Sequence, residues 1–261
     1  MENGLFMKVL VALAGNGARF KEQGFETIKP LIRTGNMPMI QKVVDSFNWP
    51  NAEYYFITRR LHLEQFPYLQ TLLESMGHVT VIENETRGAA ETAIACRPIV
   101  ESDDPFISIN CDQIFEWDTK ELEQLIKDQP NTSWLTVYQS LDEARHSFAL
   151  PKVEGLNIFD KFNETYARVN HVSEKTRLGT TSPTATTGFY HFASGKVFKE
   201  CVDHALTEPP QYGGEYFMGP IYNELIKRNH NVCMYKVEKP TFWPTGTVAD
   251  YIEYNHYWVS K

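Results

Sequence analysis

The sequence predicts an α/β fold built on a mainly parallel sheet. The first observation is the run Lys8–Ala14, which is apolar after its lysine and rich in valine. A strand that is covered on both faces need not alternate polar and apolar residues, so this run indicates a buried strand. The second observation is that strand-like and helix-like segments alternate as far as Tyr138. Such alternation is typical of parallel strands joined by right-handed crossovers.

Each element of the first half has its own local signal. Apolar residues at helical spacing predict a helix at Met39–Phe47, and Gly77 predicts the end of a helix at Tyr68–Met76. Further helices are expected at Gly88–Ile99 and Thr119–Lys127. Four more strands are expected at Ala52–Thr58, His78–Ile82, Pro105–Asn110 and Ser133–Tyr138.

From about Ser147 the pattern changes, because short strand-like segments follow one another through turns or loops. These segments are Phe148–Val153, Leu156–Asn163, Val169–Ser173 and Thr186–Phe192. Two helices are expected next, at Lys196–Leu206 and Glu215–Arg228. A last strand at Val232–Val237 and a closing helix at Val248–Trp258 complete the chain.

Composition limits the classes of function. The 261 residues suffice for one large α/β domain or two small ones, and 42% of them are hydrophobic. A net charge of −8 argues against a general nucleic-acid-binding surface. A polyphosphate ligand needs only local positive charge, and four cations crowd one loop, namely Arg19, Lys21, Lys29 and Arg33.

The cysteines and the hydropathy pattern indicate a cytoplasmic protein. The four cysteines form no C-x-x-C motif, so free thiols in a reducing compartment are expected. They are Cys96, Cys111, Cys201 and Cys233. No apolar run approaches the length of a membrane span, and the N-terminus lacks a signal-peptide core. We therefore expect no membrane association.

The segment after the first strand has the features of an anion-binding loop. Gly15–Gly17 lets the backbone turn sharply, and successive exposed N–H groups in such a turn form a concavity for anions. Arg19 follows at once, and Lys29 stands before Pro30 at the far end of the loop. We interpret the loop as a triphosphate cradle. The alternatives are an ordinary strand-to-helix turn with surface cations, or a dinucleotide-binding turn, which would need a third glycine where Phe20 stands.

These residues carry a family resemblance. The stretch Leu13–Phe20 followed by Ile28–Leu31 resembles the signature L-A-G-G-x-G-T-R-L, a spacer and P-K-P-L of the sugar-1-phosphate nucleotidylyltransferases. Three positions depart from it: Asn16 replaces the second glycine, Ala18 a threonine or serine, and Ile28 the first proline. The resemblance, patchier after Ser147, implies a three-layer α/β/α fold of the nucleotide-diphospho-sugar transferase type with a mixed, mainly parallel sheet. A single domain, 1–261, would comprise a nucleotide-binding half, 1–146, and an acceptor-binding half, 147–261.

The resemblance also implies an activity. The enzyme would condense a nucleoside triphosphate with a sugar 1-phosphate, or a similar phosphate acceptor, to give an NDP-sugar and pyrophosphate, with Mg²⁺ as cofactor. Arg19 would hold the β and γ phosphates, Lys29 would bridge the α-phosphate and the attacking phosphate, and Asp112 would bind the metal. The loop residues implied to bind nucleotide are Leu13, Ala14, Gly15, Asn16, Gly17 and Ala18.

The turn Glu83–Thr92 resembles the base-reading segment of that family. Gly88 and Ala89 fit the pattern, but Glu83 stands where the family has glutamine. A carboxylate only accepts hydrogen bonds, so it suits an exocyclic amine or a ring N–H of the base. We expect Glu83 to help choose the base; the alternative is that it faces solvent while backbone groups read the base.

The acceptor side resembles the family in shorter motifs. Glu174–Lys175 resembles an E-K-P segment, with Thr176 in place of the proline. The resemblance implies that the acceptor substrate is bound by Asn110, Phe148, Ala149, Glu174, Lys175, Gly188 and Glu215. Pro244 stands where the family has a second metal-binding aspartate, which leaves Asp112 as the metal ligand. Asp250 is expected in the first turn of the closing helix, where its charge suits the helix dipole.

Two other functions stay open at this point. An NDP-sugar-using glycosyltransferase of related fold usually needs a D-x-D pattern, but Gln113 and Ile114 follow Asp112. A non-catalytic nucleotide-binding regulatory protein is suggested by Pro244. The base, the acceptor, which could be a non-sugar phosphate such as phosphocholine, and assembly into a homo-oligomer are not fixed by the sequence.

Overall fold

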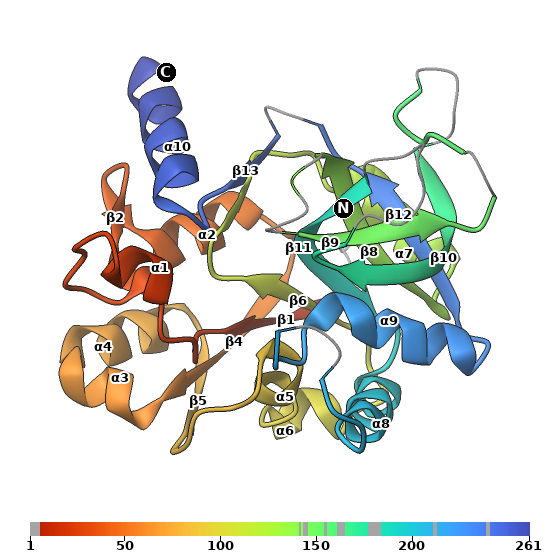
Figure 1. Cartoon of the computed structure of the whole chain (residues 1–261), viewed down its shortest axis with the longest axis horizontal. Coiled ribbons are helices and arrows are strands. Elements are labelled where there is room, and N and C mark those ends of the chain that lie inside the picture. The colour runs from red at the N-terminus through yellow and green to blue at the C-terminus, as the bar shows by residue number, and fades with distance from the viewer. Residues whose placement is uncertain are drawn as a thin grey trace.

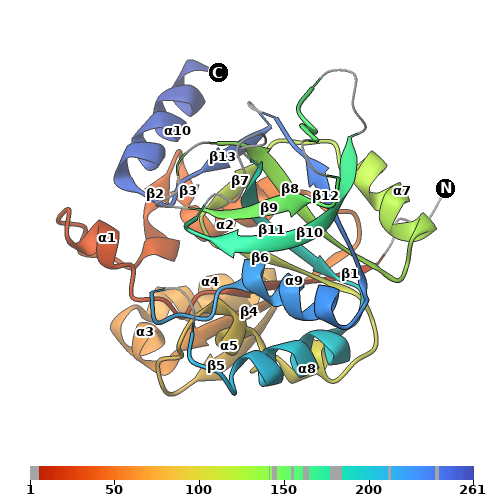
Figure 2. The same ribbon diagram turned by 45° about the vertical axis from the view of Figure 1, so that its right-hand side comes forward.

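The chain folds around one large mixed sheet (Figure 1; Figure 2). The computed structural model describes residues 6–140, 142, 146–153, 156–160, 165–176, 184–210, 213–238 and 241–261. Within these residues, nine strands follow the order β5-β4-β1-β6-β11-β8-β12-β10-β9. Their bounds are β1 Met7–Ala12, β4 Ala52–Arg59, β5 His78–Ile82, β6 Phe106–Asn110, β8 Thr132–Gln139, β9 Ser147–Pro151, β10 Tyr166–Glu174, β11 Thr184–Phe192 and β12 Asn231–Lys236.

The mainly parallel sheet predicted from the sequence holds for one half only. Strands β5, β4, β1 and β6 pair in parallel, as does β12 with β8. The pairings β6–β11, β11–β8, β12–β10, β10–β9 and β9–β11 are antiparallel, so the sheet is mixed, as the resemblance implies. A parallel pair needs a long crossover, usually a helix. The described residues between positions 147 and 192 contain no helix that could supply one.

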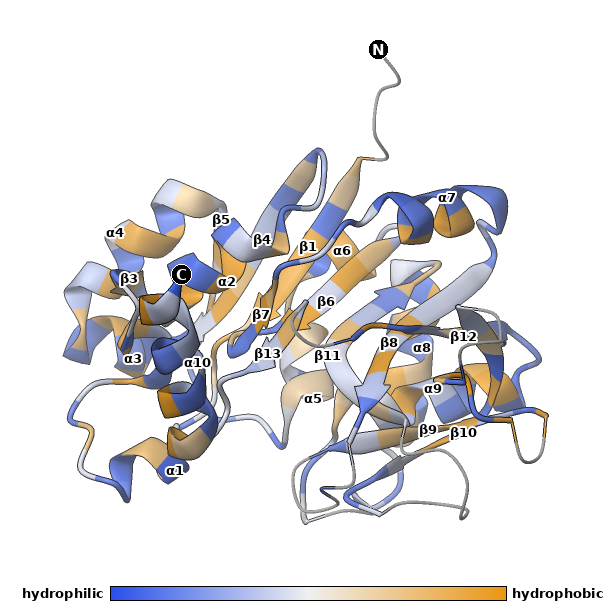
Figure 3. Cartoon of the chain, turned by 90° about the horizontal axis from the view of Figure 1, so that it is seen from above, coloured by the Kyte–Doolittle hydropathy of each residue, from blue (hydrophilic) through white to orange (hydrophobic). Residues whose placement is uncertain are grey.

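Helices cover both faces of the sheet, which gives the three layers that the resemblance implies. One face carries α2 Met39–Phe47, α3 Arg60–Gln65, α4 Pro67–Met76, α7 Lys120–Asp128 and α10 Val248–Ser260. The other carries α5 Ala89–Ala93, α6 Arg97–Val100, α8 Gly195–Ala205 and α9 Met218–Lys227. Strand β1 is apolar after Lys8 because Val9 and Val11 pack on the first face and Leu10 on the second. Figure 3 shows the helices on the two sides of the sheet, coloured by hydropathy.

The predicted elements appear with small shifts, and two predictions need correction. Helix α2 and strand β5 have the predicted bounds. The helix expected at Gly88–Ile99 is two short helices, because the chain leaves the helical conformation at Cys96, with ψ of 78°; Pro98, which has no N–H to donate, lies in the first turn of α6. No strand forms at residues 156–160, and the rest of the predicted strand Leu156–Asn163 lies outside the described residues.

Several short elements were not indicated by the sequence. They are α1 Ala18–Lys21, a 3₁₀ helix η1 at Lys29–Leu31, the pair β2 Arg33–Thr34 and β3 Met37–Pro38, and the pair β7 Gln113–Phe115 and β13 Phe242–Pro244. All four cysteines are free, as expected. Among the described residues, none of the helices has the length and apolarity needed to cross a bilayer.

The helix expected to open at Glu215 begins at Met218 instead. The residues before it stay extended because Tyr216 pairs through its backbone with the turn after β5. The Tyr216 N–H donates to the Arg87 carbonyl at 2.6 Å, and the Ala90 N–H donates to the Tyr216 carbonyl at 3.0 Å. This bridge joins the first half of the chain, 1–146, to the second half, 147–261.

Gly88 makes this bridge possible, so its replacement should destabilise the protein. Its φ of 129° is unfavourable for other residues, and an added Cβ would stand 2.6 Å from the Tyr216 backbone nitrogen and oxygen. We expect Gly88→Ala to lower the free energy of unfolding by at least about 3 kcal/mol, measured by urea unfolding. Gly15→Ala is the control, since nothing lies within 4 Å of its added Cβ. Equal stability of the two variants would contradict the assignment.

His191 predicts a loss of stability in acid. It is fully buried in β11, and neither ring nitrogen has a hydrogen-bond partner among the described residues. Burial lowers the pKa of His191 to about 3. In the unfolded state His191 binds a proton below about pH 6.5, whereas in the folded state it does so only below about pH 3. The free energy of unfolding therefore falls as the pH is lowered from about 6.5 to about 3.

We expect the titration of His191 to lower the free energy of unfolding by about 2 kcal/mol when the pH falls from 7 to 5. His191→Phe cannot titrate and should remove that part of the pH dependence, which urea unfolding at the two pH values would measure. His256→Gln, on the surface, is the control variant. Identical pH dependence in the wild type and His191→Phe would show that His191 accepts its proton without unfolding.

Candidate active site

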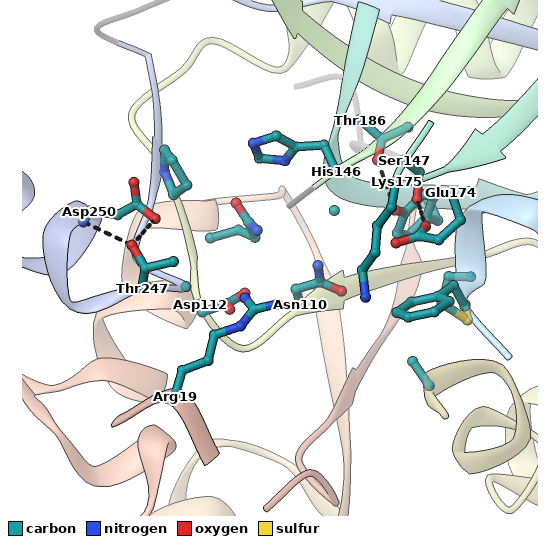
Figure 4. A pocket seen from close by; sticks show the side chains of 18 residues that line it. Arg19, Asn110, Asp112, His146, Ser147, Glu174, Lys175, Thr186, Thr247 and Asp250 are labelled. Carbon is teal, nitrogen blue, oxygen red and sulfur yellow. Dashed lines mark hydrogen bonds between the residues drawn. The ribbon is translucent and has the colours of Figure 1, made fainter. Parts of the chain in front are cut away.

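A cleft opens where the direction of strand order changes. From β1 the chain continues to β4 on one side, whereas β6 lies on the other side of β1. Ligands of open α/β sheets bind outside the carboxyl ends of strands at such a switch point. A cavity of about 190 Å³ lies here (Figure 4). Its lining includes Arg19, Ala89, Asn110, Asp112, Gln113, His146, Ser147, Glu174, Lys175, Gly188, Pro244 and Asp250.

The glycine loop delivers Arg19 to this cleft. Gly17 takes a left-handed conformation, with φ of 63°, at the N-cap of helix α1. Arg19 then lies in the first turn of that helix and lines the cavity. Gly15 has open space on the side where a Cβ would stand, so the loop backbone stays accessible to a ligand. The loop therefore presents one fixed cation beside free backbone, as the sequence predicts.

Lys29 and Asp112 form an ion pair across the switch point. The Lys29 ammonium donates to Asp112 Oδ2, and the two side chains are 18% and 14% exposed. Burial opposes the charge of Lys29, but the attraction of Asp112 outweighs burial and raises the pKa of the lysine. Lys29 is therefore cationic at neutral pH, and the Asp112 carboxylate is already partly neutralised.

The segment after β13 packs directly on Asp112. The N–H and the hydroxyl of Thr245 both donate to the Asp112 carbonyl, at 2.8 and 2.9 Å. A Cβ on Gly246 would lie 3.0 Å from Asp112 Oδ2, so glycine permits this close approach. Pro244 pairs with Gln113 in the β13–β7 ribbon. The proline thus borders the same cleft as Asp112 and offers it no carboxylate.

Asp250 lies where the sequence predicts. It is in the first turn of α10, whose N-cap residue is Thr247. The Thr247 hydroxyl donates to Asp250 Oδ2 at 2.6 Å and accepts from the Asp250 N–H at 3.2 Å. The Asp250 carboxylate therefore serves the cap of this helix, although it also lines the cleft.

A buried carboxylate marks the other end of the cleft. Glu174 is 3% exposed, and burial raises its pKa, while the Ser147 hydroxyl donates to its Oε2. Lys175 follows it, with its ammonium 4.8 Å from the centre of the Phe217 ring. Gly188, with φ of 86°, leaves room for the Asn110 side chain, which would lie 2.6 Å from an added Cβ. These contacts bring Glu174, Lys175, Asn110 and Gly188 together.

Other predicted residues lie elsewhere. Leu13, Ala14, Phe148 and Ala149 are buried in the core behind the cleft. Glu215 is exposed and lines a different cavity, bordered by α8 and α9. Ala89 lines the cleft, whereas Gly88 contacts Tyr216. Glu83 is exposed, and its Oε1 accepts from Arg60 Nε and Nη2 at 3.3 and 3.2 Å.

Sequence reasoning missed two residues beside the glycine loop. Arg59 ends strand β4, and Glu85 lies in the turn after β5. Both contact the Asn16 side chain. Arg59 belongs to no motif, so only the adjacency of β4 to β1 could have indicated it, whereas Glu85 lies within the segment Glu83–Thr92 but was not singled out there. Gln113 and His146, which line the cleft, were likewise not singled out.

Comparison with known proteins agrees with this geometry. A family model described as "Nucleotidyl transferase" matches residues 8–260. The chain belongs to the nucleotidyl transferase family. Among curated relatives of this family member, the mannose-1-phosphate guanyltransferases of Aspergillus oryzae and Saccharomyces cerevisiae are each 24% identical, over 162 and 164 residues. The matches cover 60% of this chain but 44% and 45% of those proteins, so the chain spans less than half of their length.

Solved structures share the fold over the whole chain. A nucleoside-diphosphate-sugar pyrophosphorylase from Vibrio cholerae RC9 has a TM-score of 0.77 and 21% identity, covering 96% of this chain and all of that one. A UDP-glucose pyrophosphorylase complexed with UDP-glucose has a TM-score of 0.76 and 18% identity, covering 98% of this chain and 99% of that one. The inositol-1-phosphate CTP transferase from T. maritima has a TM-score of 0.71 and 15% identity, covering 98% of this chain and 97% of that one. These likenesses confirm the expected fold.

Proposed function

We propose that this protein transfers a nucleotidyl group from a nucleoside triphosphate to a sugar phosphate, or a similar phosphorylated acceptor, and releases pyrophosphate. One observation carries the proposal: Arg19 lines a single cleft together with Asp112, to which Lys29 is paired, and with the buried Glu174 and its neighbour Lys175. The first three suit a polyphosphate, and the last two suit a polar phosphorylated acceptor. The names of the relatives and the neighbouring folds, which include guanyl- and CTP transferases, support the same reaction class.

The chemistry is a substitution at the α-phosphorus. An oxygen of the acceptor phosphate forms a new P–O bond as the bond from the α-phosphorus to the bridging oxygen of the β-phosphate breaks, and pyrophosphate leaves. Arg19 would stabilise the charge that grows on the leaving group. Lys29 would lie between the α-phosphate and the attacking phosphate. Such catalysis depends on positioning and preorganised charge and needs no covalent intermediate.

Acceptor recognition falls to the far end of the cleft. Glu174 can accept hydrogen bonds from hydroxyl groups, since the Ser147 hydroxyl occupies only one of its oxygens. Lys175, the next residue in the chain, would form an ion pair with the acceptor phosphate. This arrangement suits a hydroxylated acceptor that carries phosphate at one end.

Magnesium fits the donor set at Asp112. The described residues contain no cluster of three or more His, Cys, Asp or Glu side chains, so they form no complete metal cage. Magnesium commonly uses one or two carboxylates together with substrate phosphates and water. Asp112 would therefore hold the ion, which when bound supplies neutralising charge at the α-phosphate. The partners we propose are thus a nucleoside triphosphate, a sugar phosphate and Mg²⁺, in the cytoplasm.

Pyrophosphate release tests the proposal. Purified protein with Mg²⁺ would be mixed with each nucleoside triphosphate and a panel of sugar phosphates, phosphocholine included, and pyrophosphate measured by a coupled assay. Release that needs both substrates supports nucleotidyl transfer. Turnover of an NDP-sugar without pyrophosphate would instead indicate a glycosyltransferase. Nucleotide binding with no turnover across the panel would indicate a regulatory protein.

A further inference from the structure

A second charged cluster lies on the side of the glycine loop away from Asp112. The strand order places the carboxyl ends of β5, β4 and β1 side by side, and a side chain from each meets there. Arg59 Nη1 donates to Asn16 Oδ1 at 2.6 Å, and Asn16 Nδ2 donates to Glu85 Oε1 at 2.5 Å. Arg59 Nη1 also lies 3.7 Å from Glu85 Oε2. The Asn16 amide is therefore fixed at both ends.

Burial gives the members of this cluster different roles. The Arg59 side chain is 10% exposed, whereas the Glu85 side chain is 58% exposed. A buried guanidinium must keep its partners, because an uncompensated buried charge is costly. Arg59 and Asn16 therefore hold Glu85 in place beside the ends of β1 and β4, and more than half of its side chain stays exposed to solvent. A carboxylate has about four acceptor positions, so the two contacts leave others free.

The direction in which a nucleotide would lie brings its base to this cluster. If the proposed function holds, the reacting phosphates lie at Arg19 and Lys29, beside the ends of β1 and β6. The acceptor lies at Glu174 and Lys175, on the far side of β6. The base must then extend the opposite way, over the ends of β4 and β5.

We propose that Glu85, positioned by Asn16 and Arg59, selects a base that carries an exocyclic amine. The inference rests on the proposed function for the placement of the triphosphate. Cytosine, guanine and adenine each present an amine that donates to a carboxylate. Uracil and thymine present a single ring N–H between two carbonyl oxygens, and these oxygens repel a carboxylate. Glu85 therefore favours CTP, GTP or ATP over UTP and dTTP.

Glu83 provides a matched comparison. It lies two residues earlier, carries the same charge and is similarly exposed, at 66%. Its carboxylate is held by Arg60 on α3, and no contact joins it to the glycine loop among the described residues. The expectation from the sequence that Glu83 helps to choose the base, and the proposal for Glu85, thus predict opposite results from two similar variants.

The test is equilibrium binding of CTP, GTP, ATP, UTP and dTTP by calorimetry, with Mg²⁺ and no acceptor. In the wild type, at least one amine-bearing nucleotide should bind about tenfold or more tightly than UTP and dTTP, the ratio expected for one hydrogen bond to a charged group. Glu85→Gln should reduce this ratio about tenfold, because an amide also donates to carbonyl oxygens. Glu83→Gln should leave it unchanged.

Asn16→Gly separates positioning from folding. Glycine is the residue of the family signature at this position, so the loop can form while Glu85 loses its fixed neighbour. This variant should also reduce the binding ratio, by less than Glu85→Gln does. Preferred binding of UTP or dTTP by the wild type, an unchanged ratio in Glu85→Gln, or a reduced ratio in Glu83→Gln would each overturn the assignment to Glu85.

The calorimetry also distinguishes this inference from the proposed function. A base preference that depends on Glu85, without pyrophosphate release from any acceptor, would uphold base selection and reject the transfer reaction. Pyrophosphate release together with a binding ratio that is unchanged in Glu85→Gln would uphold the transfer reaction and reject base selection by Glu85.

Discussion

Removal of either cation of the glycine loop should lower turnover by at least about a hundredfold. In the proposed reaction, Arg19→Ala would remove the charge that faces the leaving pyrophosphate, and Lys29→Ala would remove the charge between the two reacting phosphates. A preorganised charge donor at a developing negative charge contributes a factor of this size. It corresponds to about 2.7 kcal/mol of transition-state stabilisation for each side chain. The measurement is the steady-state rate of pyrophosphate release at saturating nucleotide and acceptor.

Lys21→Ala is the matched control for these variants. Lys21 lies on the same short helix as Arg19 but is exposed and is not part of the cleft lining. Its removal should change turnover little. The comparison therefore separates the effect of losing any positive charge from the effect of losing a charge at the cleft. Rates close to wild type in both Arg19→Ala and Lys29→Ala would reject the phosphate cradle.

The sequence predicted the elements whose signal is local. Lys8–Ala14 is apolar after its lysine, and strand β1 forms there at Met7–Ala12, between β4 and β6; the helical spacing of Met39–Phe47 gave α2 with the predicted bounds. The helix at Glu215 failed because its start depends on a backbone bridge between Tyr216 and the turn at Arg87, more than a hundred residues away. No local pattern encodes such a pairing.

The same distinction applies to the candidate site. Arg19, Lys29 and Asp112 stand in or beside recognisable motifs; Arg19 and Asp112 line one cleft, and Lys29 pairs with Asp112. Arg59 and Glu85 follow strands whose neighbours in the sheet are unknown until the strand order is known. The segment Ser147–Ala149 was predicted to line the acceptor pocket. Of its residues Ser147 lines the cleft, whereas Phe148 and Ala149 are buried in the core.

The second large effect is expected at the carboxylate of Asp112. Asp112→Asn should abolish activity, because it removes both the proposed metal ligand and the partner that holds Lys29. Asp250→Asn should do little, since an asparagine oxygen can still accept from the Thr247 hydroxyl at the start of α10. The two variants make the same chemical change in one cleft, so their difference in pyrophosphate release identifies the carboxylate that matters.

The Lys29–Asp112 pair also predicts how magnesium binds. The ammonium of Lys29 already neutralises Asp112, and Pro244 adds no second carboxylate, so the free protein should bind Mg²⁺ only weakly. Substrate phosphates would draw Lys29 towards themselves and supply further oxygen ligands, so affinity should rise in the ternary complex. Pro244→Asp should raise it further. Calorimetry with Mg²⁺, with and without a non-hydrolysable nucleotide, measures each case. Tight binding without nucleotide, or an inactive but folded Asp250→Asn, would show that the metal site lies elsewhere.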